Sequence, residues 1–257
     1  MPDDLVRDRR GPIIVARLNR PDARNALTPE MIRGIGATIV DAEGDPEVRA
    51  VVLTGTGDRA FCAGMDLRRF AAGEQSGLAD DEAARGFFRL IEGGITIPVV
   101  GAANGTAVAG GFELLLGCDV IIASSDAEFG LPEVKRGLFP AGGGTSLGTR
   151  VPLGIALEMT LTGDAITAER AFALGLVNAV VNPAEVLGAA LAVAERIAAN
   201  GPLGVAAVKE LVRMGVSDPA RAHERLHEWR DVVFNSEDAK EGAMAFVEKR
   251  TPVWRGR

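Results

Sequence analysis

The chain has 257 residues, of which 47% are hydrophobic and 25% charged, and its formal net charge is −7. This composition is typical of a globular protein, and the length predicts one large domain or one domain with a smaller appendage. The acidic balance argues against nucleic acid as the main partner, because binding a phosphate backbone needs a basic face.

The first three quarters of the chain alternate between strand and helix patterns. Short apolar, β-branched runs predict strands over residues 12–18, 48–54, 97–103, 120–124 and 176–181. Thr28 is a cap residue followed by proline, which predicts a helix from there to about Glu43. Thr167 opens another helix that ends near Gly175. Alternating strands and helices predict an α/β fold.

From Asn182 onward the pattern is helical throughout. Helices are predicted over residues 183–199, 202–214, 219–234 and 237–249. Ser236 caps the last one, and the acids that follow it complement the helix dipole. The first is apolar almost all round, so we expect it to pack against another helix or another subunit. A helical C-terminal subdomain is therefore expected.

The chain carries few signals of export or membrane insertion. Two cysteines, Cys62 and Cys118, are too few for a disulfide framework and predict buried thiols in a reducing compartment. The N-terminus has no apolar signal region, and no apolar run reaches the roughly 18 residues that a membrane span needs. We expect a cytoplasmic protein that does not bind membranes.

Residues 223–227 read HERLH and contain both histidines of the chain. Histidines four positions apart share one face of a helix and could bind zinc, as in the H-E-x-x-H motif. However, Arg225 lies between them, and only Glu241 or Glu248 could supply a third ligand. The neighbouring residues are strongly charged, so we favour a solvated surface helix and expect no metal.

Residues 55–60 read GTGDRA, directly after a predicted strand. They match the G-x-G-x-x-A fingerprint of dinucleotide sites, in which a helix follows at once. Here Gly64 lies where that helix would run. A lone match is weak evidence, and we favour a plain connection between elements.

Glu113 raises a different question, because it lies in an apolar run directly after Gly110 and Gly111. A buried, unpaired charge costs several kcal/mol. If the run is a helix, its first N–H groups and its dipole favour an anion or a developing oxyanion at the two glycines. Glycine also lets a ligand approach the backbone closely.

Glu133 is a second carboxylate in a similar setting. It stands twenty positions further on, after a predicted strand and before the glycine-rich residues 140–144. Taken alone, Glu113 and Glu133 could each be an ordinary acid near the start of a helix, which is common. The residues by themselves leave the ordinary and the functional interpretations open.

Several motifs stand in a characteristic order: 19–27 (NRPDARNAL), 60–67 (AFCAGMDL), 98–105 (PVVGAANG) with 109–114 (AGGFEL), 129–133 (FGLPE), 142–144 (GGG), 161–164 (LTGD), 239–242 (AKEG) and 246–250 (FVEKR). Together they resemble the motifs of the crotonase superfamily, the enoyl-CoA hydratase/isomerase fold. The resemblance spans nearly the whole chain and is specific for the superfamily. It is much less specific for the reaction, because this fold hosts many CoA chemistries.

The resemblance implies a crotonase-like spiral of strand-strand-helix repeats over residues 1–195, which holds the CoA and catalytic site. Residues 196–257 would be a helical subdomain for oligomerisation that also completes the CoA site. The implied assembly is a homotrimer or a dimer of trimers. No cofactor is implied, since coenzyme A enters as part of the acyl-CoA substrate.

The resemblance also implies roles for individual residues. The thioester oxygen would accept hydrogen bonds from the backbone N–H groups of Met65 and Gly110, which form an oxyanion hole. Glu113 would mainly activate the water that attacks C3, and Glu133 would mainly protonate C2. Two close carboxylates are expected to share one proton. The residues implied in binding CoA or substrate are Arg24, Ala26, Ala63, Gly64, Asp66, Leu67, Gly111 and Lys249.

Both glutamates being present favours an enoyl-CoA hydratase, since superfamily members that only shift a double bond often lack one of them. An enoyl-CoA isomerase and a 3-hydroxyacyl- or carnitinyl-CoA dehydratase stay open as alternatives. A non-catalytic acyl-CoA-binding protein is less favoured. Ala141 departs from the glycine of many hydratases and could alter substrate preference. Phe87, Phe88 and the Gly- and Ala-rich segment 71–85, expected to be a mobile loop or a solvated connection, are candidates for the acyl pocket.

Overall fold

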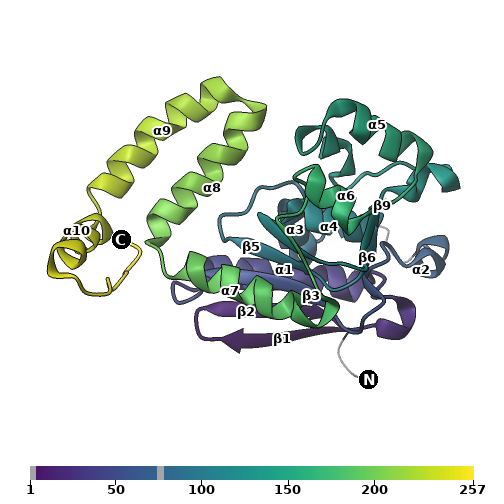
Figure 1. The fold of residues 1–257 in the computed structure, drawn as a ribbon, viewed down its shortest axis with the longest axis horizontal. Helices are drawn as coiled ribbons and strands as arrows, with labels where there is room; N and C mark the ends of the chain where they lie inside the picture. Colours follow the sequence, from purple (N-terminus) through teal and green to yellow (C-terminus); the bar gives the residue numbers. More distant parts are fainter. Residues whose placement is uncertain (1–3, 74–77) are drawn as a thin grey trace.

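The computed structural model describes residues 4–73 and 78–257, without the side chains of Phe70 and Ala79. Two β-sheets organise the chain (Figure 1). The larger sheet has the order β1 (Leu5–Arg10), β2 (Ile13–Leu18), β3 (Ala50–Gly55), β5 (Val99–Ala103), β7 (Val120–Ser124) and β10 (Ala179–Val181), and only β1 is antiparallel to its neighbour. The smaller sheet has the order β4 (Ala60–Cys62), β6 (Thr106–Val108), β8 (Glu128–Gly130) and β9 (Ile166–Thr167), with β9 antiparallel to β8.

From β3 to β8, consecutive strands alternate between the two sheets. Strands β3, β5 and β7 lie in the larger sheet, and β4, β6 and β8, which follow them directly, lie in the smaller one. Helical segments follow each pair: α2 (Leu67–Ala71) and α3 (Arg85–Ile91), then α4 (Gly110–Gly117), then η4 (Pro132–Arg136), η5 (Gly144–Thr149) and α5 (Leu153–Thr162). This is the strand-strand-helix repeat, so the predicted α/β class and spiral are confirmed.

Both faces of the larger sheet are covered. Val51 and Leu53 of β3 belong to the core that includes α1 (Pro29–Gly44) and α4, whereas Ala50 and Val52 pack with α7 (Val186–Ala198) on the other face. Side chains alternate along a strand, so a strand buried on both faces becomes a continuous apolar run. The apolar α7 was expected to meet another helix or subunit, and that expectation is wrong in part, because its buried face lies on the sheet.

The predicted helix starts are correct, because their caps form. Each predicted cap side chain accepts a hydrogen bond from the backbone N–H three residues on, at the start of α1, of α6 (Ala168–Ala173) and of α10 (Glu237–Glu248): Thr28 from Met31 at 3.2 Å, Thr167 from Arg170 at 3.3 Å and Ser236 from Ala239 at 2.9 Å. Such a cap typically contributes about 1 kcal/mol to stability.

The C-terminal helices are α8 (Pro202–Ser217), α9 (Pro219–Phe234) and α10, and they follow η6 (Pro183–Glu185) and α7. Figure 1 shows α8 and α9 as a hairpin beside the spiral, with α10 at the left edge of the view, below the C-terminal end of α9. The predicted helical C-terminal region is thus present. Among the described residues, no single helix is long and apolar enough to cross a bilayer; residues 183–198 and 202–217 meet the criterion only as a pair bent by 110°.

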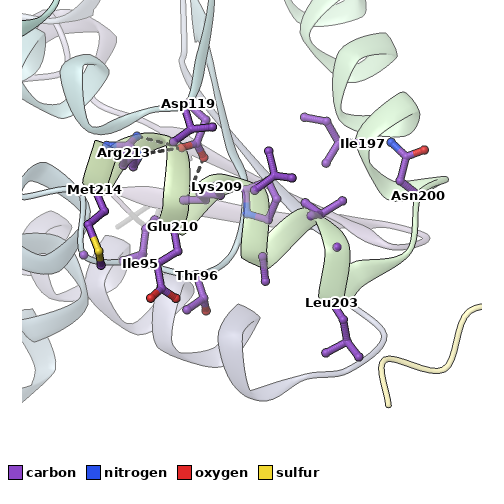
Figure 2. Close-up of a pocket in the computed structure, with 18 of the residues that line it drawn as sticks. Ile95, Thr96, Asp119, Ile197, Asn200, Leu203, Lys209, Glu210, Arg213 and Met214 are labelled. Atoms are coloured by element: carbon purple, nitrogen blue, oxygen red, sulfur yellow. Dashed lines mark hydrogen bonds and ion pairs between the residues drawn. The ribbon is translucent and has the colours of Figure 1, made fainter. Parts of the chain in front are cut away.

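A partly buried charge cluster joins α8 to the spiral. Lys209 and Arg213 reach from α8 to Asp119, which lies just after α4, and each makes an ion pair of 2.8 Å with it (Figure 2). The Lys209 side chain is only 7% exposed. Arg213 also donates to the carbonyl of Gly117, at the end of α4, at 2.8 Å. This cationic group complements the negative end of the α4 dipole.

An open cavity of about 1470 Å³ adjoins this cluster, lined by parts of α8, α10 and residues 91–98. Neither Glu113 nor Glu133 lines it. Its size therefore reflects the gap between the C-terminal helices and the spiral rather than the position of the two carboxylates.

The segment 71–85 contains two short helical turns. Residues Leu78–Asp80 and Glu82–Ala84 form the turns η2 and η3, and Leu78 and Ala84 are buried. Residues 74–77 lie outside the described residues, so the expectation of a mobile loop there stays a prediction. The two cysteines are buried free thiols, as predicted, and burial raises the pKa of each to about 12.

Candidate active site

The N-terminus of α4 is formed by a backbone that tolerates little change. Ala109, just before the helix, has φ 51° and ψ −135°, a conformation that costs a non-glycine residue about 1–3 kcal/mol. Its N–H donates to Gly130 at 3.0 Å. A Cβ on Gly111 would lie 2.2 Å from the carbonyl oxygen of Cys62, so only glycine fits. The helix start is therefore fixed against β4 and β8.

Met65 lies beside this helix start on a second segment. Leu27 and Met65 form an isolated parallel bridge, in which Leu27 donates to Gly64 at 2.8 Å and Asp66 donates to Leu27 at 3.0 Å. This pattern leaves the N–H of Met65 pointing away from the bridge. A Cβ built on Gly110 would lie 3.8 Å from the nitrogen of Met65, so the two backbones adjoin.

Within residues 4–73 and 78–257, neither the N–H of Met65 nor that of Gly110 donates a hydrogen bond. Two unused donors on adjoining, rigid backbone segments can stabilise a developing oxyanion. Gly64 has φ 87°, and a Cβ there would lie 2.7 Å from the Cβ of Ala109. The glycine therefore allows the two segments to approach.

Glu113 lies one turn into α4 and is 6% exposed. Its Oε1 accepts hydrogen bonds from the backbone N–H groups of Gly142, at 2.7 Å, and Gly144, at 2.9 Å. Burial raises the pKa of this carboxyl, and the two N–H groups only partly offset that rise. A Cβ on Gly142 would lie 2.7 Å from Oε2, so the space beside the second oxygen depends on that glycine.

Glu133 lies in the first turn of η4 and is half-buried. Burial raises the pKa of its carboxyl, and the negative charge of Glu113 raises it further, against the opposing effects of its own backbone N–H and of Arg136. Its Oε2 is buried and has no hydrogen-bond partner among the described residues. The pair can therefore hold one proton and one negative charge, which is what general acid–base catalysis needs.

Most of the other residues expected at the site lie near Met65. Arg24, in the left-handed region after η1 (Pro21–Ala23), is exposed, and its carbonyl accepts from Ala63 at 3.0 Å. Leu67 begins α2 and is 46% exposed. Asp66 forms an ion pair of 3.1 Å with Arg20, and Arg20 also donates to the carbonyl of Ala26 at 2.7 Å.

The sequence reading missed Arg20. The only signal was its place in the motif 19–27, because its partner Asp66 is 46 positions away. It also missed Gly142 and Gly144 as hydrogen-bond donors to Glu113.

Residues 8–257 match the family model described as enoyl-CoA hydratase/isomerase. The chain belongs to this enoyl-CoA hydratase/isomerase family. It is 38% identical over 264 residues to the carnitinyl-CoA dehydratase of Salmonella enteritidis PT4, with each chain fully covered. The crotonase-type enzyme class is therefore established for this chain.

Solved structures of the family have the same fold. An enoyl-CoA hydratase from Mycobacterium tuberculosis H37Rv matches with a TM-score of 0.92 and 42% identity, over 99% of this chain and 100% of that one. A carnitinyl-CoA hydratase from Mycobacterium avium matches with a TM-score of 0.77 and 41% identity, over the whole of both chains. Because the chain is similarly identical to enzymes named for different substrates, these comparisons do not identify the acyl group of its own substrate.

Lys249 does not join the other residues of the family site within one chain. It ends α10 in the left-handed region, with φ 55°, and is exposed. Figure 1 shows α10 at the opposite end of the molecule from α2, because the α8–α9 hairpin carries it outward. The expectation that Lys249 helps to bind CoA would therefore need a second copy of the chain.

The two alternative motifs do not form sites. His223 and His227 lie on the exposed side of α9 with their ring centroids 5.2 Å apart, and Arg225 between them pairs with Glu210 at 2.6 Å. No group of three metal-binding side chains occurs in the part of the chain that the structure describes. Residues 55–60 lead from β3 straight into β4, with no helix, so they are not a dinucleotide fingerprint.

Proposed function

We propose that the chain is an enoyl-CoA hydratase, which adds water reversibly across the 2,3 double bond of an enoyl-CoA thioester. One observation carries the proposal: Glu113, a carboxyl with a raised pKa, lies on the helix that begins at the unused donor Gly110, and it acts on the pKa of a second carboxyl, Glu133. A protein that only binds acyl-CoA would not need one buried and one half-buried acid close together, because removing carboxyl groups from water costs stability.

The oxyanion hole accounts for the electrophilic half of the reaction. The thioester oxygen accepts hydrogen bonds from Met65 and Gly110, and negative charge grows on it as water adds at C3. Donors that are already oriented stabilise this enolate more than the neutral thioester. Losing one such donor typically costs about 3 kcal/mol of barrier.

The two glutamates account for the proton transfers. Ionised Glu113 takes a proton from the water as its oxygen bonds to C3, and protonated Glu133 gives its proton to C2. The product gains one water in total. The proton on Glu113 then passes to Glu133, which restores the starting state of the pair. The raised pKa of both acids supports the sharing of one proton by the pair.

Dehydration of a 3-hydroxyacyl-CoA is a second candidate for the physiological direction. The relative at 38% identity is named a carnitinyl-CoA dehydratase, and dehydration is the same reaction in reverse. Identical groups serve both directions, so only the acyl pocket separates the candidates. Neither requires a metal or a redox cofactor, since the thioester itself acidifies C2.

We also propose that the enzyme works in the cytoplasm as a homotrimer or a dimer of trimers. The support is the C-terminal region, where Val208, Val212 and Val216 on α8 are more than half exposed beside the open cavity. Contiguous exposed apolar surface of this kind marks an interface.

The test is a panel of enoyl-CoA thioesters, short, long, branched and carnitine-derived, assayed by the ultraviolet absorbance of the conjugated thioester. Hydration removes the absorbance, whereas a 2,3-to-3,4 isomerisation leaves a double bond that mass spectrometry shows without added water. The kcat/KM values across the panel assign the acyl group. Binding of every substrate without turnover would refute the proposal.

A further inference from the structure

Arg20 stands at the junction of the two segments that carry half of the proposed oxyanion hole. It lies between β2 and η1, and its side chain is only 20% exposed. Arginine is seldom buried to this degree without partners that use its fixed donors. The partners of Arg20 therefore indicate its role.

One nitrogen of its guanidinium contacts both segments. The Nη1 of Arg20 donates to the carbonyl of Ala26 at 2.7 Å and to Oδ2 of Asp66 at 3.1 Å. Ala26 directly precedes Leu27, and Asp66 directly follows Met65, while Leu27 and Met65 form the bridge between the segments. Arg20 thus links the two segments next to the Leu27–Met65 bridge, at a residue adjacent to the Met65 donor.

The base of the Arg20 side chain is itself fixed. Its backbone N–H donates to Oδ1 of Asn25 at 2.9 Å, and its carbonyl accepts from the N–H of Asn25 at 2.8 Å. Asn25 is fully buried and donates from its side chain to the carbonyls of Thr56, at 3.0 Å, and Ala60, at 2.9 Å. The guanidinium therefore projects from a rigid turn.

The Met65 segment is held by a small number of hydrogen bonds: Ala63 donates to the carbonyl of Arg24 at 3.0 Å, and the Leu27–Met65 bridge supplies two more. Residues 63–66 connect β4 to α2 without regular structure, and Gly64 has φ 87°. A catalytic donor must stay within about 0.5 Å of its productive position. These backbone hydrogen bonds do not involve the Asp66 side chain, and Arg20 links that side chain to the carbonyl of Ala26.

Arg20 does not have the surroundings of a phosphate ligand. Asp66 lies 3.1 Å from it, and Asp4 lies 3.6 Å from its Nε, so its charge is neutralised within the chain. The Asp66 side chain is 16% exposed and also accepts from the N–H of Arg68 at 3.2 Å. Asp66 is therefore engaged in holding the segment, rather than free to bind CoA as the family resemblance implied.

We propose that Arg20, with Asp66 as its partner, is a positioning residue that keeps the N–H of Met65 aligned with that of Gly110. This inference rests on the proposed function, because it assigns the pair to an oxyanion hole for an acyl-CoA thioester. Its effect is on the stability of the enolate, not on the affinity for the CoA portion.

The test compares Arg20→Gln, Arg20→Lys and Asp66→Asn. We expect each to lower kcat by about 10- to 100-fold, part of the loss seen when an oxyanion donor is removed, with KM changed by less than about threefold. Arg20→Lys keeps the charge but not the guanidinium geometry, so it should not restore kcat. The double variant Arg20→Gln/Asp66→Asn should be no worse than either single variant, because the two act as one unit.

Binding supplies a readout that a purely structural role would not change. A 3-ketoacyl-CoA presents an enolate to the donors, whereas a saturated acyl-CoA of equal length presents a neutral thioester. The ratio of the two affinities should fall with kcat in the variants, while the affinity for saturated acyl-CoA stays constant. Arg7→Gln is the matched control, since it breaks an exposed Arg–Asp pair and should leave every value unchanged.

The outcomes separate the possible explanations. If the affinity ratio stays at the wild-type value in folded Arg20→Gln, or if only the affinity for saturated acyl-CoA falls, the positioning role is refuted. If Arg20→Gln does not fold, Asp66→Asn and Arg20→Lys carry the same test. If the wild-type enzyme binds both ligands but hydrates no enoyl-CoA, the proposed function fails while the affinity ratio still decides the role of Arg20.

Discussion

Valines line both strand β3 in the spiral and helix α8 in the C-terminal region, but they are buried only in the spiral. Val51 and Val52 are 0% exposed, whereas Val208, Val212 and Val216 are 62%, 65% and 62% exposed. The spiral buries its apolar side chains on both faces of a sheet. The C-terminal helices leave an apolar surface that one chain does not cover.

The buried charged side chains of the two regions also have different kinds of partner. In the spiral, Glu113 is buried and held by backbone N–H groups close to another acid, an arrangement that favours chemistry over stability. In the C-terminal region, Lys209 is buried and paired directly with Asp119, which joins the regions. The comparison agrees with the proposal that the spiral carries the chemistry and α8–α10 carry assembly.

The strongest test of this division is Glu113→Gln in the spiral. Gln still accepts hydrogen bonds from Gly142 and Gly144 but cannot take a proton from water. We expect kcat to fall at least 100-fold, roughly the lower limit for losing a general base, with acyl-CoA affinity and oligomeric state unchanged. Steady-state kinetics measures kcat and the apparent affinity, and sedimentation measures the oligomeric state. Glu158→Gln, at an exposed glutamate on α5, is the control that should keep full activity.

The next largest effect is expected at the joint between the regions. Asp119→Asn leaves Lys209 buried without its counter-charge, which should lower the free energy of unfolding by about 3–5 kcal/mol. Urea denaturation measures this loss. The control Lys135→Met breaks a pair exposed by 49% and 73%, worth less than about 1 kcal/mol. Equal losses in the two variants would mean that the cluster does not join the regions.

A smaller effect on the single chain, but a direct one on assembly, is expected from Val212→Asp on α8. A charge in the middle of an apolar interface should weaken association by about 30-fold, equivalent to about 2 kcal/mol. Sedimentation over a range of concentrations would show it. Val40→Asp, at a valine of α1 that is 48% exposed, should leave the assembly intact. Unchanged association in Val212→Asp would move the interface elsewhere.

The sequence predicted the parts of the spiral that owe their structure to their own composition. The strands β2, β3, β5 and β7 are apolar runs, and their predicted positions agree with the structure to within two residues. It missed β1, whose sequence LVRDRR is charged, because this edge strand is held mainly by its pairing with β2 and by surface ion pairs rather than by an apolar pattern. It also missed the strands of the smaller sheet, which are two or three residues long and form only through tertiary pairing.

The candidate site likewise contains residues that the sequence could predict and residues that it could not. Glu113 could be singled out because a carboxylate in an apolar run is unusual, and Glu133 because it precedes a glycine-rich stretch; the family resemblance then implied that the two act together. The N–H groups that hold Glu113 come from residues 29 and 31 positions further on, and no pattern in the sequence near Glu113 predicts these hydrogen bonds. The same holds for Arg20, because a surface arginine and a positioning arginine have the same neighbours in sequence.

The smallest expected effect distinguishes function from stability within the spiral itself. The pKa of Glu133 is raised above 4.5, so the folded protein binds its proton more tightly than the unfolded chain does. Stability contributed by this group therefore falls as pH rises from about 4.5 through the raised pKa.

The variant Glu133→Gln removes that pH dependence of stability. Its melting temperature should exceed that of the wild type at pH 8, and the difference should vanish near pH 4, even though activity is lost. Differential scanning calorimetry at the two pH values decides it. A variant less stable than the wild type at pH 8 would mean that ionised Glu133 stabilises the fold, and the orphaned Oε2 would then need a structural explanation instead of a catalytic one.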